Sequence, residues 1–142
     1  MEFRAKKFKE LTTIEIYEIL KSRAEIFLLE QRIICQDMDG KDYESLHCFF
    51  VENDRVIAYL RAFCSGEGVV TVGRVLTLEH KKGIGTKLMQ KSIEEIKKEF
   101  SCKKIVAHAQ KQAVGFYKKI GFNAVSEEYL EEGIPHITME IS

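Results

Sequence analysis

The sequence lacks an excess of either charge, since 22 lysine and arginine residues balance 22 aspartate and glutamate residues over 142 positions. Proteins that bind nucleic acid or anionic membranes usually carry a basic surface, so neither partner is expected. The sequence also lacks an apolar run long enough to cross a membrane, and its first residues, MEFRAKK, are too polar for a signal peptide. A cytoplasmic protein is therefore predicted.

Cysteine motifs, proline and repeats are also scarce, and each shortage excludes a kind of organisation. The four cysteines are scattered without a C-x-x-C pair, which argues against a zinc site and indicates reduced thiols. A single proline, no Ser- or Gly-rich stretch and no repeat leave no place for a linker. Residues 1–142, of which 45% are hydrophobic, are therefore predicted to form one domain.

The most informative stretch is a strand followed by two glycines and a helix. The apolar, β-branched run Val69–Leu78 predicts a buried strand. Gly83 and Gly85 come next, and apolar residues then recur at helical spacing on one face as far as Phe100. Gly73 lies inside the strand, where a glycine predicts a β-bulge or the close approach of a ligand.

Two glycines at the start of a helix suit an anion-binding site. The first helical turn has four unpaired N–H groups and the positive end of the helix dipole, and glycines leave these donors open to a phosphate. Lys81 and Lys82 add positive charge at this point. The alternative is that Gly83 and Gly85 only let the helix and the strand pack closely. A dinucleotide fingerprint is excluded, because Leu88 stands where its third glycine belongs.

Residues 80–85 resemble the acetyl-coenzyme A signature of the GNAT superfamily of N-acetyltransferases, [QR]-x-x-G-x-[GA]. They read HKKGIG, so His80 replaces the usual Gln or Arg. A second GNAT signature, A-x-x-F-Y-x-x-x-G-F, begins at Ala113, with Gln110 in place of the usual Asn. The segments at residues 23–31, 36–40 and 133–137 are similar to the ElaA-type branch of the family, so the resemblance covers nearly the whole chain.

The remaining elements are predicted from capping, turn signals and periodicity. Thr12 and Glu15 form a capping box, which predicts a helix reaching about Leu28. Further strands are predicted at residues 3–8, 47–52, 56–63, 104–109, 122–129 and 134–141, and a short helix at residues 110–121.

These elements predict the fold class. Strand, helix and strand over residues 69–109 imply one parallel pair, and the hairpins are antiparallel. We therefore predict an α/β (α+β) fold with a mixed, mostly antiparallel sheet flanked by helices. The resemblance implies the GNAT fold, in which the sheet is splayed around a coenzyme groove between strands 69–78 and 104–109.

The chemistry of acyl transfer to an amine needs a base, a stabilised oxyanion and an acid for the leaving thiolate. The resemblance implies that Tyr117 is the acid, and a phenol is protonated at neutral pH; the alternative is a core aromatic residue. His136 suits the base, and Glu30, Asp39 and Glu128 are alternatives. Arg23 and Glu30, near the end of the first predicted helix, also fit a solvated helix face or a structural ion pair.

The resemblance also implies which residues contact the ligands. Acetyl-CoA, the cosubstrate, is expected at Val75, Leu76, Lys81, Lys82, Gly83, Ile84, Gly85, Thr86, Gln110 and Phe116. Asp37 and Asp39, in an acidic loop, would attract a cationic amine acceptor; a plain solvated loop is the alternative. The resemblance makes Arg74, next to Gly73, an acceptor-binding residue in the wall of the active site. No metal is expected.

The predicted function is transfer of an acetyl group from acetyl-CoA to a primary amine of a small molecule or protein. Two alternatives stay open: an acyl-CoA sensor without turnover, and a nucleotide-binding or interaction module with structural glycines. Exposed edge strands in the last hairpin leave room for a homodimer.

Overall fold

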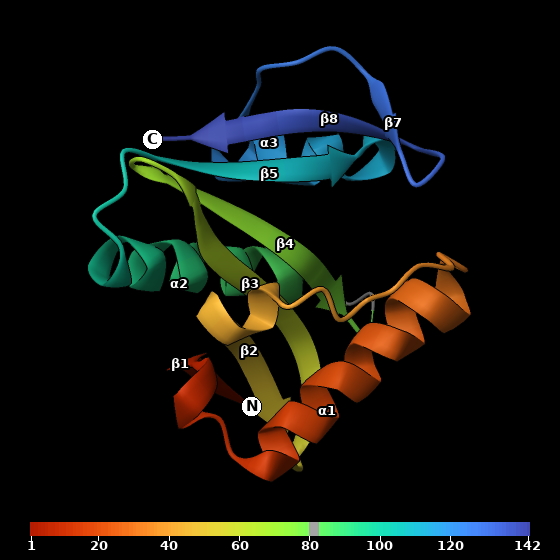
Figure 1. Cartoon of the computed structure of the whole chain (residues 1–142), viewed down its shortest axis with the longest axis vertical. Helices are drawn as coiled ribbons and strands as arrows, with labels where there is room; N and C mark the ends of the chain where they lie inside the picture. The colour runs from red at the N-terminus through yellow and green to blue at the C-terminus, as the bar shows by residue number, and fades with distance from the viewer. Residues whose placement is uncertain (80–82) are drawn as a thin grey trace.

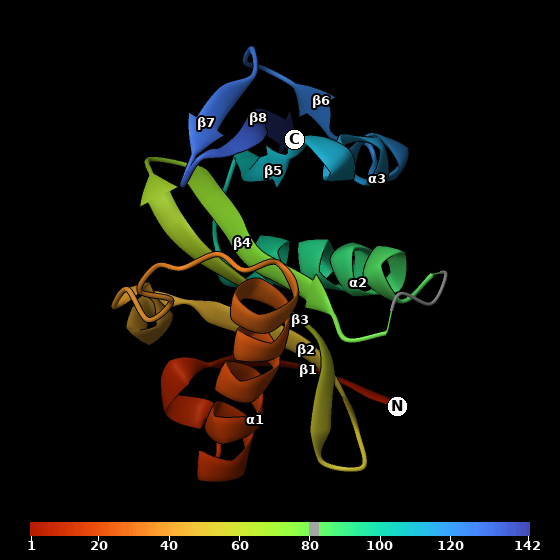
Figure 2. The same cartoon turned by 90° about the vertical axis from the view of Figure 1, so that its right-hand side faces the viewer.

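The computed structural model describes residues 1–79 and 83–142, which form one eight-stranded sheet with helices on both faces (Figures 1 and 2). The strands are β1 (Glu2–Lys7), β2 (Leu46–Glu52), β3 (Arg55–Gly66), β4 (Val69–Thr77), β5 (Lys104–Gln110), β6 (Asn123–Ala124), β7 (Tyr129–Glu131) and β8 (Ile134–Ile141). The helices are α1 (Thr13–Arg23), which continues as a π-helical segment over Ala24–Glu30, α2 (Ile84–Glu99) and α3 (Val114–Ile120).

The sheet is splayed between β4 and β5. The strand order is β1-β2-β3-β4-β5-β8-β6, and β7 also pairs with β8. Among the described strands only β4 and β5 pair in parallel, and they do so over Val69–Val72 and Lys104–Ala107. Beyond these residues β4 stays with β3 and β5 stays with β8, so the two halves of the sheet diverge (Figure 1). The predicted mixed, mostly antiparallel sheet with its splay is confirmed.

The two faces of the sheet carry two separate cores. On one face, α2 buries Leu88, Met89 and Ile96 against alternate residues of β2 and β3. On the other face, Ile19 and Ile26 of the first helical segment pack against the intervening residues of the same strands. This two-sided burial explains why β2 is apolar along almost its whole length instead of alternating. α1 and α2 therefore lie on opposite faces (Figure 2).

The boundaries of several elements differ from the sequence-based expectation. The capping box is present, because Thr12 Oγ1 accepts from Glu15 N at 3.1 Å, but the helical segment runs on to Glu30. β3 extends to Gly66, since a bulge between Cys64 and Gly66 lets the chain keep pairing after the predicted turn begins. The predicted strand 122–129 is broken into β6 and β7, and the predicted helix 110–121 begins with a 3₁₀ turn.

The last hairpin lies at one edge of the sheet, as predicted. β6 ends the strand order and is only two residues long, and β1 forms the other edge. A short edge strand offers few backbone groups to a second chain. A homodimer through this edge stays a prediction.

A cluster of three arginines and three aspartates ties the segment after α1 to the sheet. Arg23, only 1% exposed, donates from Nε to Asp37 Oδ2 at 2.9 Å and from Nη1 to Asp42 Oδ1 at 2.7 Å. Arg61 of β3 binds both oxygens of Asp39, at 2.8 and 2.6 Å, and also Asp42 at 3.1 Å. Bidentate, charge-assisted hydrogen bonds of this kind fix geometry strongly.

Arg74 of β4 completes this Arg–Asp cluster. Its Nε donates to Asp37 Oδ1 at 2.8 Å and its Nη2 to the Asp37 carbonyl oxygen at 2.9 Å. Asp37 therefore joins Arg23, at the end of α1, to Arg74, in the sheet. With three positive and three negative side chains, the cluster has no net charge.

The cluster makes folding sensitive to acid. Hydrogen bonds from Arg61 hold the pKa of Asp39 below its usual range. Burial alone would raise the pKa of Asp42, but hydrogen bonds and charge from Arg23 and Arg61 outweigh it and the pKa is lowered. Burial also lowers the pKa of the neighbouring His47. Because the pKa values of all three groups are lowered in the folded protein, the unfolded chain binds more protons as the pH falls. The free energy of unfolding therefore falls below about pH 6.5, where histidine titrates in the unfolded chain, and again below about pH 3.9, where aspartate does.

We expect Asp42→Asn to lower the free energy of unfolding by about 3 kcal/mol, because it leaves two buried guanidinium groups short of a carboxylate. Urea titrations at pH 7 measure the change. Glu25→Gln is the control, since it breaks a surface pair in which the Arg55 side chain is 50% and the Glu25 side chain 34% exposed. It should lower the free energy of unfolding by less than about 1 kcal/mol. Equal costs for the two variants would show that the cluster does not secure the fold.

Candidate active site

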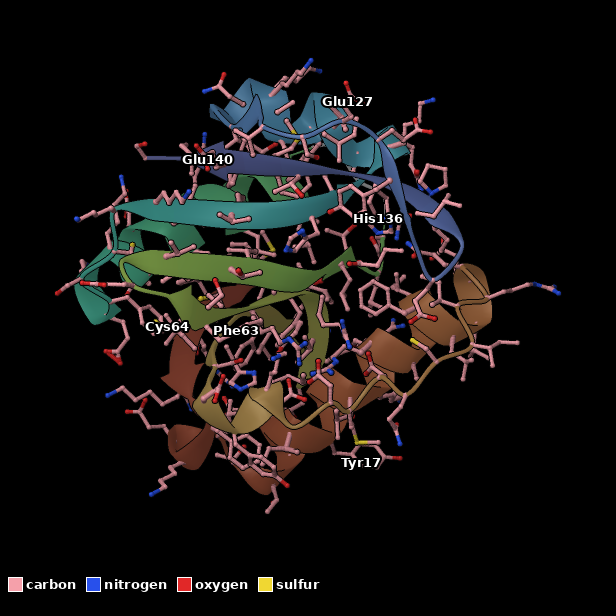
Figure 3. The ribbon with its side chains drawn as sticks, turned by 45° about the horizontal axis from the view of Figure 1, so that its top comes forward. Tyr17, Phe63, Cys64, Glu127, His136 and Glu140 are labelled. Atoms are coloured by element: carbon pink, nitrogen blue, oxygen red, sulfur yellow. The ribbon has the colours of Figure 1, made fainter. Side chains whose placement is uncertain are left out.

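A cleft of about 410 Å³ opens where β4 and β5 part. Its lining comes from both halves of the sheet, from the segment after α1 and from the turn between β7 and β8. Phe63 of β3 and His136 of β8 mark its two sides, with β4 and β5 between them (Figure 3). Seven of the predicted site residues line it together: Asp37, Asp39, Arg74, Val75, Gln110, Tyr117 and His136.

A β-bulge forms the wall of this cleft on β4. Arg61 pairs with Gly73 and Tyr59 with Leu76, so β4 has one residue more than β3 between these pairs. Arg74 sits in the bulge with φ 52°, a backbone conformation that is uncommon outside glycine. A Cβ atom added at Gly73 would meet nothing within 4 Å, so the space beside it is open. The predicted bulge is confirmed.

The two glycines before α2 have different physical reasons. Gly83 is the N-cap of α2 with φ 93°, which favours glycine, and a Cβ there would face open space. A Cβ at Gly85 would lie 3.3 Å from Cε1 of Phe116, so Gly85 allows α2 and α3 to approach closely. Gly85 therefore has a packing reason, although its nearest neighbour is on α3 rather than on the strand. Phosphate binding at these glycines stays a prediction.

The start of α2 keeps its polar groups available. Among the described residues, no side chain caps Gly83 and no acidic side chain stands in the first turn. Ile84, Gly85 and Thr86 form that turn and are half-buried, and Lys87 N is the donor that reaches the Gly83 carbonyl oxygen, at 2.9 Å. Such a turn suits an anion. The predicted contacts at Lys81 and Lys82, and His80, lie outside the described residues.

Tyr117 lies deep in the cleft. It is 6% exposed, and the rings of Phe116 and Phe122 meet it edge to face at 5.2 and 5.3 Å. Burial raises the pKa of Tyr117 well above its usual range, so the phenol holds its proton throughout the neutral range. α3 places this side chain in the cleft while its neighbour Phe116 packs on Gly85.

His136 of β8 is buried in the lining of the cleft. Its Nδ1 lies 2.7 Å from the carbonyl oxygen of Ile134, which only accepts, so Nδ1 carries a hydrogen, and in the neutral ring Nε2 has the lone pair. The ring stacks on Tyr129, with centroids 6.1 Å apart. Nε2 lies 3.5 Å from Oε2 of Glu131. A buried imidazole with a free lone pair in a cleft has the form of a general base.

Two other predicted site residues, Glu30 and Leu76, lie outside the cleft lining, and Gln110 lies within it. Glu30 is exposed at the end of the π-helical segment, outside the described lining of the cleft. Leu76 is 3% exposed, and its side chain packs in the core under α1 rather than in the cleft. Gln110 lines the cleft, and its Nε2 donates to Gln31 Oε1 at 3.0 Å while its Oε1 accepts from Gln112 Nε2 at 2.6 Å.

The acidic loop that contains Asp37 and Asp39 is not a plain solvated loop, because arginine side chains bind both carboxylates. The carboxylates of Asp37 and Asp39 face the cleft, but Arg23, Arg61 and Arg74 bind them. Of the alternatives weighed for the end of α1, a structural ion pair is therefore correct for Arg23. Attraction of a cationic acceptor by these aspartates stays a prediction.

Sequence reasoning missed several lining residues, including Gln31, Cys35, Glu131 and Glu132. Gln31 belongs to a segment similar to the ElaA-type branch, which was a usable signal. Glu131 and Glu132 have the composition of an ordinary solvated turn, and only the fold shows that this turn borders the cleft.

Two kinds of feature were sought among residues 1–79 and 83–142. No group of three or more His, Cys, Asp or Glu side chains there is arranged to hold a metal ion. No helix in the same ranges is long and apolar enough to span a membrane.

Known proteins resemble this chain over nearly its whole length. Residues 22–142 match the family model described as acetyltransferase (GNAT) domain. A UPF0039 protein of Schizosaccharomyces pombe is 35% identical over 145 residues, which cover 99% of this chain and 97% of that protein. Protein ElaA of Escherichia coli is 34% identical, over 98% of this chain and 95% of ElaA.

Solved structures agree with the sequence relatives. The crystal structure of Escherichia coli ElaA has a TM-score of 0.93, with both chains fully covered. An acyl-CoA N-acyltransferase from Pseudomonas aeruginosa also gives 0.93, at 32% identity and with both chains fully covered. Because the family model and relatives above 30% identity span the cleft and both its walls, the chain belongs to the GNAT acetyltransferase family, in its ElaA-like branch.

Proposed function

We propose that this protein transfers an acetyl group from acetyl-CoA to a primary amine. Membership of the GNAT family supports acyl transfer from an acyl-CoA, and the Pseudomonas aeruginosa relative is described as an acyl-CoA N-acyltransferase. The observation that carries the proposal is the cleft between β4 and β5, in which a protonated Tyr117 and a buried His136 line the same space. The protein is proposed to act in the cytoplasm.

The residues around the cleft fit acetyl-CoA. The uncapped first turn of α2 would receive phosphate oxygens through Ile84, Gly85 and Thr86. The open space beside Gly73 and the neighbouring Val75 would receive the thioester end. The thioester supplies the acyl group and the thiolate leaving group.

Tyr117 and His136 divide the proton transfers between them. The amine must be neutral to attack, so His136 Nε2 would take a proton from the ammonium group. Tyr117, whose pKa is raised by burial, would supply a proton to the departing thiolate. Glu30, exposed outside the cleft lining, would reach the amine only through water.

The acceptor side of the cleft is polar. Asp37, Asp39 and Arg74 would orient the acceptor through fixed hydrogen-bonding groups rather than through net charge, because the Arg–Asp cluster is neutral. A polyamine-like molecule, an amino compound and a protein lysine or N-terminus all satisfy this description.

Binding is tested by a thermal melt with acetyl-CoA and CoA, with NAD and ATP as controls. A ligand at about a hundred times its dissociation constant adds roughly 2.7 kcal/mol to the free energy of unfolding. We expect acetyl-CoA and CoA to raise the melting temperature, and NAD and ATP to leave it unchanged. If neither acetyl-CoA nor CoA raised the melting temperature, the proposed ligand would be wrong.

Tyr117→Phe should lower kcat by about 10² to 10⁴ while leaving the KM for acetyl-CoA near that of the natural protein, because only the proton donor is lost. Release of CoA, followed with a thiol reagent in the presence of an active amine, measures the rate. Tyr17→Phe, at a site 68% exposed on α1 (Figure 3), is the matched control. Unchanged turnover in Tyr117→Phe would remove the tyrosine from the mechanism.

Gly73→Ala should fold normally and bind acetyl-CoA more weakly. The added methyl group meets nothing within 4 Å in the free protein but occupies the space proposed for the thioester. Gly66→Ala is the control, since its methyl group makes only ordinary contact with Val69, at 3.8 Å, at the far end of β3. Calorimetric titration measures the affinity of each variant for acetyl-CoA. Equal affinity in Gly73→Ala and Gly66→Ala would show that the thioester does not lie beside Gly73.

A further inference from the structure

His136 and Glu131 face each other in the cleft lining with two hydrogen-bond acceptor atoms. In neutral His136 the hydrogen is on Nδ1, which donates to the Ile134 carbonyl oxygen, so Nε2 presents a lone pair. Oε2 of Glu131 faces it at 3.5 Å. Two acceptors at this distance repel unless a proton or an N–H donor lies with them, so the pair is complete only when one is supplied.

The surroundings of this pair differ on its two sides. The His136 side chain is 8% exposed, and the Glu131 side chain is 52% exposed. Both residues line the cleft, so a group bound there touches the imidazole, and solvent touches the carboxylate. The pair therefore connects a buried imidazole in the cleft to a carboxylate that is open to solvent.

The other groups packed against His136 do not compete for this proton. The Tyr129 ring stacks on the imidazole, and its hydroxyl bonds to His108 and Thr138 instead. Gln110 is the cross-strand neighbour from β5, and its amide binds Gln31 and Gln112. Glu132, next in the chain, also lines the cleft, but among the described residues only Glu131 has a carboxylate oxygen within 4 Å of a ring nitrogen of His136.

We propose that Glu131 and His136 form a proton exit, in which Nε2 of His136 takes the proton of the acceptor ammonium group and the Glu131 carboxylate stabilises the imidazolium until the proton passes to water. The N–H bond of the ammonium breaks as the Nε2–H bond forms, and the Nε2–H bond breaks when a water molecule accepts the proton. No oxidation or reduction occurs. Glu131 is a positioning residue, because it acts through His136.

This inference rests on the proposed function, but its first test does not need an active enzyme. Nuclear magnetic resonance follows the four histidine rings of the free protein against pH, and the signal lost in His136→Gln assigns His136. We expect Glu131→Gln to move the titration midpoint of His136 to lower pH, because the imidazolium loses a half-exposed carboxylate partner. Glu132→Gln, which removes the same charge from the same turn, should move it by less than half as much.

The second test is the pH dependence of kcat/KM with spermidine, L-lysine and a lysine-containing peptide as primary-amine probes. In Glu131→Gln the acid limb should move to lower pH by the same amount, with the KM for acetyl-CoA unchanged. An unmoved midpoint in the free protein would overturn the pairing, whatever the activity. A moved midpoint with an unmoved acid limb would overturn the proton exit. A moved midpoint with no turnover of any amine would overturn the proposed function and the exit with it, while leaving the ion pair in place.

Discussion

The short parallel contact between β4 and β5 is the constraint on which the rest of the structure depends. Four residue pairs, from Val69 to Val72 of β4, hold the two halves of the sheet together. The bulge at Gly73 then turns β4 aside while β5 remains paired with β8. Because the described strands leave the facing edges unpaired beyond this point, the sheet can present backbone groups to a ligand without giving up its own hydrogen bonds elsewhere.

The Arg–Asp cluster gives this cleft a fixed outer wall. Residues 31–40, between the π-helical segment and a 3₁₀ helix at Lys41–Glu44, form no helix or strand. Hydrogen bonds to arginine side chains hold this part of the chain and the 3₁₀ helix in place. A neutral arrangement has a further benefit, since a wall built of one charge would repel itself in a partly buried site. Asp37 is central to this wall, because it bonds to arginines from a helix and from the sheet.

Much of the fold followed from local signals. The capping box at Thr12 predicted the start of a helix, and the glycine in β4 predicted a bulge as one of two possibilities; the structure agrees with both. The acidic loop was harder, because a count of charges along the chain does not show that Arg61 and Arg74, distant in sequence, neutralise it. Likewise, nothing local places a turn such as Glu131–Glu132 beside a cleft, since that depends on how β8 returns along β5.

The contact between Gly85 and Phe116 links two parts of the site that lie on different helices. Position 85 opens α2, and the Phe116 ring that covers it also supports the Tyr117 ring edge to face. A larger side chain at position 85 would push the Phe116 ring and, through it, the tyrosine. The residue at 85 and the aromatic ring at 116 are therefore expected to change together in evolution, as a matched volume, and swapping helices between relatives should succeed only when both come from the same parent.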